Sequence, residues 1–266
     1  MNEAELLFTD ILNCDRLSLY VNKDLSLDKI SSSLVSAALK RRIKSEPIQY
    51  ILGKAEFMGL QFKVTPDVLI PRPETEILVE TAIKLVSGVR CQVSGVNILD
   101  LGTGSGCIAV SLAKFLPEAE IHATDISESA LEIARANARL NRVDNSISFF
   151  QSDLLTAYSL ELTAYDIIVS NPPYVPTQEI DTLQPEIQYE PRIALDGGEE
   201  GLDFYRRIIQ DAPGYLKEGG FLIMEAGFGQ KDAIKNVFQK SGFFKVIEWI
   251  KDYNNIDRVV VAKKER

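Results

Sequence analysis

The chain has little of what several classes of protein depend on. Its 266 residues include one histidine, one tryptophan and three cysteines. Cys14, Cys91 and Cys107 are widely spaced and form no C-x-x-C pattern, so they predict neither a disulfide framework nor a thiolate metal site. We therefore expect no metal cofactor and a reducing, cytoplasmic location.

Basic residues and long apolar runs are also scarce. Lys and Arg together number 29 against 38 for Asp and Glu, which gives a net charge of −9. A surface of this sign repels polyanions, so we expect no stable nucleic-acid partner. No apolar run approaches the ~18 residues that a membrane-spanning helix needs, and the acidic start differs from a signal peptide. We therefore expect no membrane partner.

Hydrophobic spacing divides the chain into three parts. Residues 1–46 carry apolar positions three and four residues apart, which predicts a small helical domain. Residues 47–72 contain alternating and β-branched stretches with glycine punctuation, and they predict a β-hairpin linker whose arms extend from Tyr50 to Val64. Residues 73–266 form the main domain, which should open with a helix that Pro73 helps to start.

The main domain alternates strand-like runs with helical stretches such as 127–140. Five such runs lie at 96–101, 120–125, 147–151, 165–170 and 221–225. This alternation predicts an α/β fold with a doubly wound, parallel, Rossmann-like sheet. The last two runs, 244–250 and 258–262, are too close together for a crossover helix, so they predict a C-terminal antiparallel hairpin on the sheet edge.

A glycine-rich loop follows the first strand of the main domain. Its residues Gly102, Thr103, Gly104, Ser105 and Gly106 permit a sharp turn, and the N–H groups that start the next helix can hold an anion. We predict that these five residues bind a cofactor. The loop also satisfies the loose G-x-G-x-x-A dinucleotide pattern, which leaves a nicotinamide enzyme open.

Acidic residues stand at the ends of the next two strands. Asp125 can accept hydrogen bonds from ribose hydroxyls, and Asp153 can accept one from the exocyclic amine of an adenine. Leu154 would add its backbone and an apolar face to the same site. Carboxylates at such turns also serve as helix N-caps. The acids therefore predict a nucleoside without saying which one.

The tetrapeptide Asn171-Pro172-Pro173-Tyr174 follows the fourth strand. Two prolines fix φ and remove two backbone donors, so acceptors remain. The Asn171 side-chain carbonyl and the Pro172 carbonyl can each accept one hydrogen of a planar NH₂, and Tyr174 offers a ring face. Such acceptors raise the electron density of an amide nitrogen. We predict that all four residues bind substrate and that Asn171, Pro172 and Tyr174 are catalytic.

Together these residues resemble class I methyltransferases that use S-adenosylmethionine. Three longer blocks, 46–53, 68–76 and 190–202, resemble the peptide chain release factor glutamine methyltransferase family. The resemblance implies S-adenosyl-L-methionine as cofactor, S-adenosyl-L-homocysteine as product, and Gly102–Gly106, Asp125, Asp153, Leu154 and Asn171 as cofactor-binding residues. It also implies N5-methylation of the glutamine in the Gly-Gly-Gln motif of class 1 release factors.

The resemblance further implies that residues 1–46 contact the release factor and that this domain is shortened relative to the family. We expect the protein to be a monomer. The nearest alternative is an amino-group methyltransferase acting on N6 of adenine or N2 of guanine in DNA or RNA, because a similar tetrapeptide holds a flipped base. The net charge of −9 argues against it.

Two further alternatives remain from other classes of protein. A nicotinamide dehydrogenase lacks a His, Lys or Tyr placed for hydride chemistry, and a non-catalytic release-factor-binding protein would not need an intact Asn171. The sequence does not decide the roles of four charged residues near the predicted site. These are Arg72, Glu74, Glu76 and Glu225.

Overall fold

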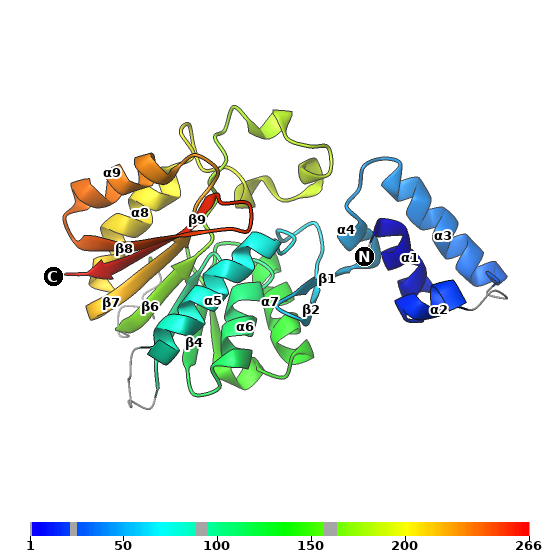
Figure 1. Ribbon diagram of the computed structural model, residues 1–266, viewed down its shortest axis with the longest axis horizontal. Helices are drawn as coiled ribbons and strands as arrows, with labels where there is room; N and C mark the ends of the chain where they lie inside the picture. Colours follow the sequence, from blue (N-terminus) through cyan, green and yellow to red (C-terminus); the bar gives the residue numbers. More distant parts are fainter. Residues whose placement is uncertain (1, 22–25, 89–94, 157–163, 266) are drawn as a thin grey trace.

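The computed structural model describes residues 2–21, 26–88, 95–156 and 164–265, so Cys91 lies outside the described residues. A helical module and a larger α/β domain lie at opposite ends of the long axis (Figure 1). A small two-stranded hairpin and the segment after it join them. Among the described helices, none is long and apolar enough to cross a membrane.

The module consists of α1 (Glu3–Ile11), α2 (Arg16–Val21), α3 (Lys29–Arg42) and the short α4 (Ile48–Leu52). Asn2 and Glu5 form a reciprocal capping box that fixes the start of α1, with N–O distances of 2.8 and 2.9 Å. Asp28 caps α3 by accepting from the Ser31 N–H at 2.7 Å. The buried core of the module is small, comprising Leu7, Ala38 and Ile48, so much of its apolar surface stays exposed.

The predicted hairpin is present but shorter than expected. β1 (Lys54–Phe57) pairs with β2 (Leu60–Lys63), and Met58 and Gly59 form the turn with φ values of 53° and 70°. Two consecutive positive φ values are typical of a two-residue type I′ turn. The prediction that the first arm begins at Tyr50 was wrong. Residues 48–52 form α4, which begins after Pro47 and ends at the left-handed Gly53.

The α/β domain contains a seven-stranded sheet in the order β5-β4-β3-β6-β7-β9-β8. Its strands are β3 (Asn97–Leu101), β4 (Glu120–Asp125), β5 (Ile147–Gln151), β6 (Tyr165–Ser170), β7 (Leu216–Glu225), β8 (Phe244–Lys251) and β9 (Asp257–Lys264). The first five are parallel, and β9 pairs antiparallel with both β7 and β8. The predicted doubly wound sheet and C-terminal hairpin are confirmed, and β7 begins five residues before its predicted start at residue 221.

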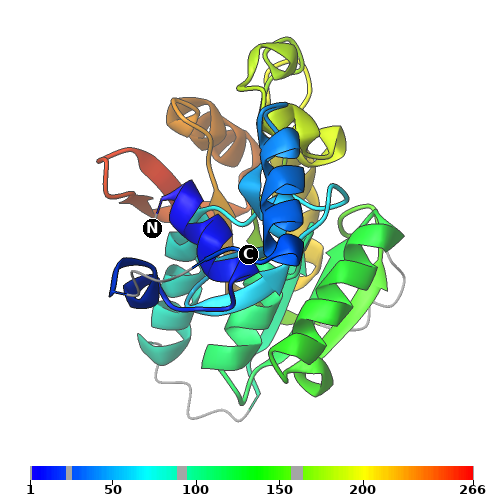
Figure 2. The ribbon, with the colours of Figure 1, turned by 90° about the vertical axis from the view of Figure 1, so that its right-hand side faces the viewer.

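Helices cover both faces of the sheet. One face packs against α5 (Pro73–Gly88), α6 (Cys107–Phe115) and α7 (Glu128–Leu140), and the other against α8 (Asp203–Asp211) and α9 (Lys231–Ser241). Neighbouring strand residues alternate between the two cores, as Ile98 and Leu99 do. This period of two explains why the central strands read as continuous apolar runs. Figure 2, turned by 90°, looks onto the helical module in front of this layered domain.

The topology brings the predicted site residues to one edge. The chain moves outward from β3 through β4 to β5 and then returns to place β6 on the other side of β3. Ligands of open α/β sheets bind at such a switch point, outside the carboxyl ends of the strands. The glycine loop after β3 and the tetrapeptide after β6 therefore become neighbours there.

Candidate active site

A cavity of about 240 Å³ lies at the carboxyl ends of β3, β4, β5 and β6. It collects residues from seven separate stretches of the chain, and most of its lining is apolar. The predicted site residues that line it are Gly102, Gly104, Asp125, Asp153, Leu154, Asn171, Pro172 and Pro173. Thr103, Ser105, Gly106 and Tyr174 lie beside this cavity and are not part of its lining.

The glycine loop has the shape that its composition predicts. Gly102, Gly104 and Gly106 have φ values of 73°, 53° and 80°, a region that glycine adopts without strain. A Cβ built on Gly102 or Gly104 would meet nothing within 4 Å, so open space lies above both residues. A Cβ on Gly106 would lie 3.0 Å from the Cβ of Ala134, so Gly106 serves the packing of α6 against α7.

The buried carboxylate of Asp100 stabilises this loop through hydrogen bonds. Asp100 accepts hydrogen bonds from the Thr103 hydroxyl at 2.6 Å and from the Ala109 N–H at 3.2 Å. Burial raises the pKa of Asp100 to about 7. Thr103 and Ser105 are themselves buried, so their side chains support the loop, and of its five residues Gly102 and Gly104 line the cavity.

Asp125 joins the loop to the next helix. Its Oδ2 accepts from the Gly104 N–H at 2.8 Å, and its Oδ1 accepts from the Ser127 N–H at 2.9 Å. Burial raises the pKa of Asp125 above its ordinary value, and these backbone donors act in the opposite direction. A carboxylate has about four acceptor sites. Asp125 therefore retains acceptor capacity toward the cavity, and Ser127 serves as the N-cap of α7.

Asp153 has a partner that the sequence did not suggest. Its Oδ2 lies 2.8 Å from Nη2 of Arg207 on α8, and the Arg207 guanidinium lies over the ring of Phe204, 6.0 Å from its centroid. Asp153, Leu154, Phe204 and Arg207 all line the cavity. Leu154 adopts a φ of 54°, which aids the turn after β5. One wall of the site thus comes from α8, more than fifty residues later in the chain.

Asn171 is held by a hydrogen bond on one side only. Its Nδ2 donates to Oγ1 of Thr75 at 3.1 Å, and Thr75 donates to Oε2 of Glu225 at 2.7 Å. The side-chain carbonyl of Asn171 is therefore the acceptor available to the cavity that this residue lines. Pro172 lines the same cavity, and the pairing of its carbonyl with that of Asn171 stays a prediction.

Tyr174 does not line the cavity, unlike the three residues before it in the tetrapeptide. Its ring packs beside the core formed by β7, α8 and α9, and burial raises its pKa above the ordinary value. Its backbone carbonyl accepts from the side chain of Gln230 at 2.9 Å. The predicted contact between the Tyr174 ring and a substrate amide is not tested by this arrangement and stays a prediction.

The glycines around residue 200 pack against the tetrapeptide. A Cβ built on Gly197 would lie 2.8 Å from both the Pro173 carbonyl and Tyr174 Cα. Val175 and Asp196 form an isolated parallel bridge in the same region. These contacts hold the tetrapeptide in position.

The structure assigns contacts to three of the four charged residues that the sequence left undecided, namely Arg72, Glu76 and Glu225. Arg72 forms an ion pair with the buried Glu190, which also accepts from the Ile70 N–H. Glu76 accepts from the Met58 N–H at 2.6 Å and so anchors the hairpin turn. Glu225 is 1% exposed at the end of β7, and burial raises its pKa to about 7.

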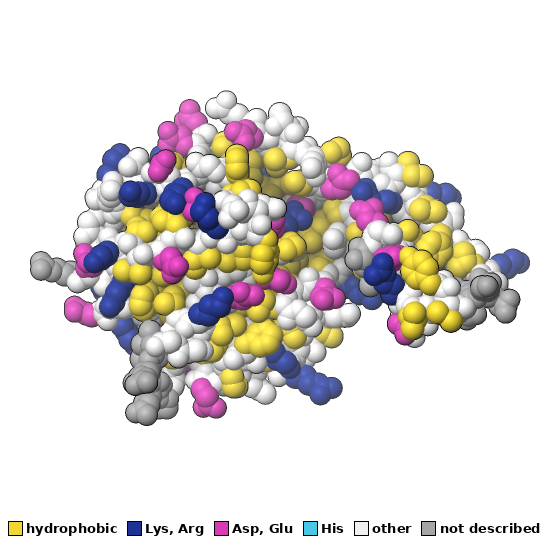
Figure 3. Space-filling model, in the orientation of Figure 1, with side chains coloured by type: hydrophobic (Ala, Val, Ile, Leu, Met, Phe, Trp, Pro, Cys, Tyr) yellow, Lys and Arg dark blue, Asp and Glu magenta, His cyan; other side chains and the backbone are white. Residues whose placement is uncertain are grey.

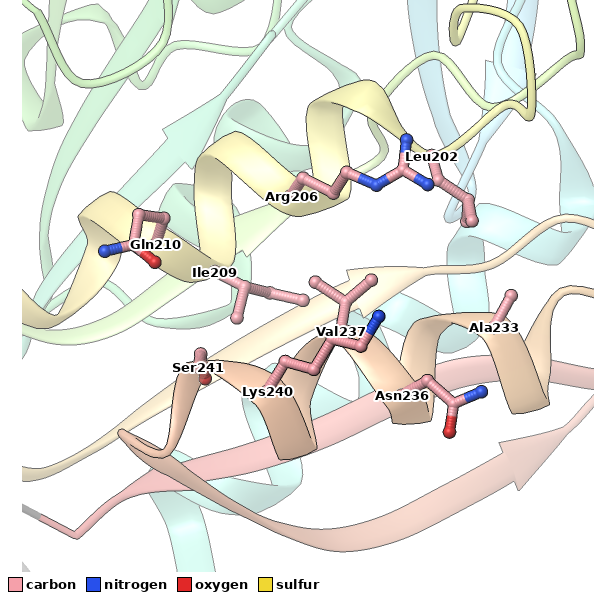
Figure 4. A pocket seen from close by; sticks show the side chains of 9 residues that line it. All are labelled: Leu202, Arg206, Ile209, Gln210, Ala233, Asn236, Val237, Lys240 and Ser241. Carbon is pink, nitrogen blue, oxygen red and sulfur yellow. The ribbon is translucent and has the colours of Figure 1, made fainter.

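A second hollow, of about 380 Å³, lies between α8 and α9 (Figure 4). The side chains of Arg206, Ile209, Val237 and Lys240 border it, and it contains none of the predicted site residues.

No group of three or more His, Cys, Asp or Glu side chains in the described parts of the chain is arranged to hold a metal ion.

Comparisons with known proteins find relatives along nearly the whole chain. The model of the PrmC N-terminal domain matches residues 1–53, and that of the methyltransferase small domain matches residues 75–199. A release factor glutamine methyltransferase from Geobacter sulfurreducens is 44% identical over 97% of this chain and 87% of its own length. One from Thermodesulfovibrio yellowstonii is 43% identical over 100% of this chain and 93% of its own length.

Among solved structures, the hMettl16 catalytic domain in complex with an MAT2A 3′UTR hairpin superimposes with a TM-score of 0.63. It covers 79% of this chain and 76% of its own, with 19% sequence identity. At this identity the likeness concerns the fold alone.

Proposed function

Because the chain belongs to the release factor glutamine methyltransferase family, we propose that it methylates the N5 amide nitrogen of the glutamine in the Gly-Gly-Gln motif of class 1 release factors. The observation that carries the proposal is the pair of acceptors at the end of β6. The Asn171 amide nitrogen is engaged by Thr75, which leaves its side-chain oxygen as an acceptor, and Asn171 and Pro172 both line the cavity. Such a rim suits a substrate that has an NH₂ to donate.

We propose S-adenosyl-L-methionine as the cofactor, and the residues at the strand ends fit it. Asp125 retains acceptor capacity for ribose hydroxyls, and open space lies above Gly102 and Gly104. The N-terminus of α6 follows the glycine loop, and the positive end of its helix dipole suits the carboxylate of an amino acid. Asp153, Leu154 and Phe204 border the space for an adenine. When bound, the cofactor supplies an electrophilic methyl group on a sulfonium.

The chain's own groups act on the substrate nitrogen. An amide nitrogen is a weak nucleophile because its lone pair is delocalised into the carbonyl. Oδ1 of Asn171 and the carbonyl of Pro172 each accept one hydrogen of the NH₂, which orients the nitrogen and raises its electron density. Positive charge that develops on nitrogen is stabilised by the same two dipoles, which are already oriented before the reaction. The prolines keep this arrangement rigid.

Residues 1–46, which make up most of the helical module, are proposed to contact the release factor. The module's small core leaves apolar side chains exposed, among them Leu17 at 69%, Ile30 at 72% and Ile43 at 83%. In Figure 3 hydrophobic side chains are visible on this module. Exposed apolar surface on this scale is typical of a protein-binding face. The module approaches the active-site domain through an Arg42–Glu186 ion pair and a Tyr189–Lys44 hydrogen bond.

The direct test is a methylation assay with an intact class 1 release factor and its variant in which the motif glutamine is alanine. Mass spectrometry should show a gain of one methyl group on the glutamine-containing protein and none on the variant. Equal methylation of both proteins, or none on either while S-adenosylhomocysteine binds, would refute the proposed substrate.

Methylation of an adenine or guanine amino group is not favoured, because the full-length relatives carry the release factor name. The net charge of −9 also opposes binding to a polyanion. An arm of the same assay with duplex DNA and structured RNA covers this alternative, and methyl transfer to either would support it.

A further inference from the structure

Three side chains from three elements form a continuous hydrogen-bonded chain behind the cavity. Asn171 follows β6, Thr75 lies in the first turn of α5, and Glu225 ends β7. The distances are 3.1 Å from Asn171 Nδ2 to Thr75 Oγ1 and 2.7 Å from Thr75 Oγ1 to Glu225 Oε2. Thr75 and Glu225 are 2% and 1% exposed, so water does not compete for these bonds.

The chemistry of these groups fixes the direction of each bond. An ionised carboxylate only accepts, so the single hydroxyl proton of Thr75 points at Glu225. The Thr75 oxygen then offers only lone pairs to its other neighbour. Asn171 must therefore present its NH₂ to Thr75, which leaves its carbonyl oxygen for the cavity.

We infer that Thr75 and Glu225 are positioning residues that fix the orientation of the Asn171 amide, so that the substrate NH₂ meets an acceptor. This inference rests on the proposed function, because it assumes that Asn171 holds the substrate nitrogen. With the amide reversed, two NH₂ groups would face each other, and neither could accept. The oxygen and the NH₂ of the Asn171 amide differ little in shape. A neighbouring group of fixed hydrogen-bonding character is therefore needed to select one orientation.

The surroundings hold both positioning residues in place. Tyr205 donates a 2.8 Å hydrogen bond to the Glu225 carbonyl, which fixes the end of β7. Glu76, next to Thr75, is bonded to the hairpin turn at Met58. Thr75 therefore sits on an anchored helix start and Glu225 on an anchored strand end, as supporting groups for a precise contact must.

The test compares Thr75→Val with Thr75→Ser. Serine keeps the hydroxyl that bonds to both Asn171 and Glu225. Valine keeps the shape of the threonine side chain and loses both hydrogen bonds. We expect single-turnover methylation of the release factor to fall about tenfold to a hundredfold in Thr75→Val. The KM for release factor and the affinity for S-adenosylhomocysteine should stay within about threefold, and Thr75→Ser should stay within about threefold of wild type in every measurement.

Glu225→Gln supplies a second readout, which a merely structural role would not move. A protonated Glu225 can donate to Thr75, whose hydroxyl would then turn its proton toward Asn171 and favour the reversed amide. The wild-type rate should rise between pH 6 and 8, roughly around the pKa of about 7, and Glu225→Gln should lose that rise. The charged and titratable groups that act on Glu225 are Arg258, Arg72, Glu74, Tyr174, Tyr205 and Cys107. All of them are unchanged in this variant.

A third readout separates this inference from the proposed function. The NMR signals of the Asn171 side-chain NH₂, assigned with Asn171→Asp, should exchange slowly with water in wild type and Thr75→Ser and rapidly in Thr75→Val. This result does not depend on any methylation. Failure of wild type to methylate the release factor would overturn the proposed function alone. Equal rates and equal NH₂ exchange in Thr75→Val and Thr75→Ser would overturn the positioning role.

Discussion

Replacement of Asn171 by alanine should separate catalysis from cofactor binding. The substitution removes one of the two acceptors that face the substrate nitrogen and leaves the glycine loop and Asp125 intact. Loss of one preoriented hydrogen-bonding group in an active site costs about 10²- to 10³-fold in kcat. We therefore expect a rate loss of that size, with the affinity for S-adenosylhomocysteine within about threefold of wild type.

The structure also predicts that this variant folds. The Asn171 NH₂ donates to Thr75, but the Thr75 proton stays on Glu225, so alanine leaves no buried donor without an acceptor. Single-turnover methylation and calorimetric titration with S-adenosylhomocysteine measure the two effects. Asn141→Ala is a matched control, because Asn141 also donates through its side-chain amide, to the Gln61 carbonyl, away from the cavity. Parallel loss of rate and cofactor affinity in Asn171→Ala would refute the role given to this residue.

Three further predictions concern the cofactor site, the packing and the pH dependence. Asp125→Ala should weaken S-adenosylhomocysteine binding about tenfold to a hundredfold. Asp153→Ala should weaken it less than about tenfold, because Asp153 forms an ion pair with Arg207. Calorimetry that gives the reverse order would contradict the assignment. Gly197→Ala should destabilise the fold by about 1–3 kcal/mol, because its Cβ would strike the Pro-Pro-Tyr backbone, whereas Gly214→Ala, which meets nothing within 4 Å, should leave the unfolding free energy unchanged. Burial raises the pKa of Glu225 from 4.5 to about 7, so its contribution to stability is complete below pH 4.5 and is lost as the pH rises to 7. The unfolding free energy, measured by denaturation between pH 4.5 and 7, should therefore fall with pH in wild type and fall less in Glu225→Gln.

Most of the sheet was predictable because its strands are buried on both faces. Runs such as 120–125 and 165–170 are short, carry β-branched residues and are separated by helical periodicity, and β4 and β6 occupy those residues. The error at Tyr50 has a physical origin. A five-residue apolar segment has no period that separates helix from strand, and the buried Tyr50 side chain suits either. Its hydroxyl bonds to the Val68 carbonyl at 2.6 Å, a contact invisible in local sequence.

The candidate site was predictable only where a motif carries its own chemistry. The glycine loop and the tetrapeptide each indicate their chemistry within a few residues. Strand order then predicts that the two motifs lie next to each other at the switch point. Thr75, Phe204 and Arg207 carry no such local signal. Thr75 lies in a segment that resembles the family, but its bond to Asn171 exists only because α5 packs beside β6 and β7. Arg207 reaches Asp153 only through the packing of α8.

The most direct test of the central claim is a crystal structure with S-adenosylhomocysteine and a Gly-Gly-Gln peptide bound. The glutamine amide nitrogen should lie about 2.8–3.2 Å from both Oδ1 of Asn171 and the carbonyl oxygen of Pro172, with its free face toward the cofactor sulfur. A bound glutamine whose nitrogen faces the Asn171 NH₂, or lies outside this cavity, would contradict the account.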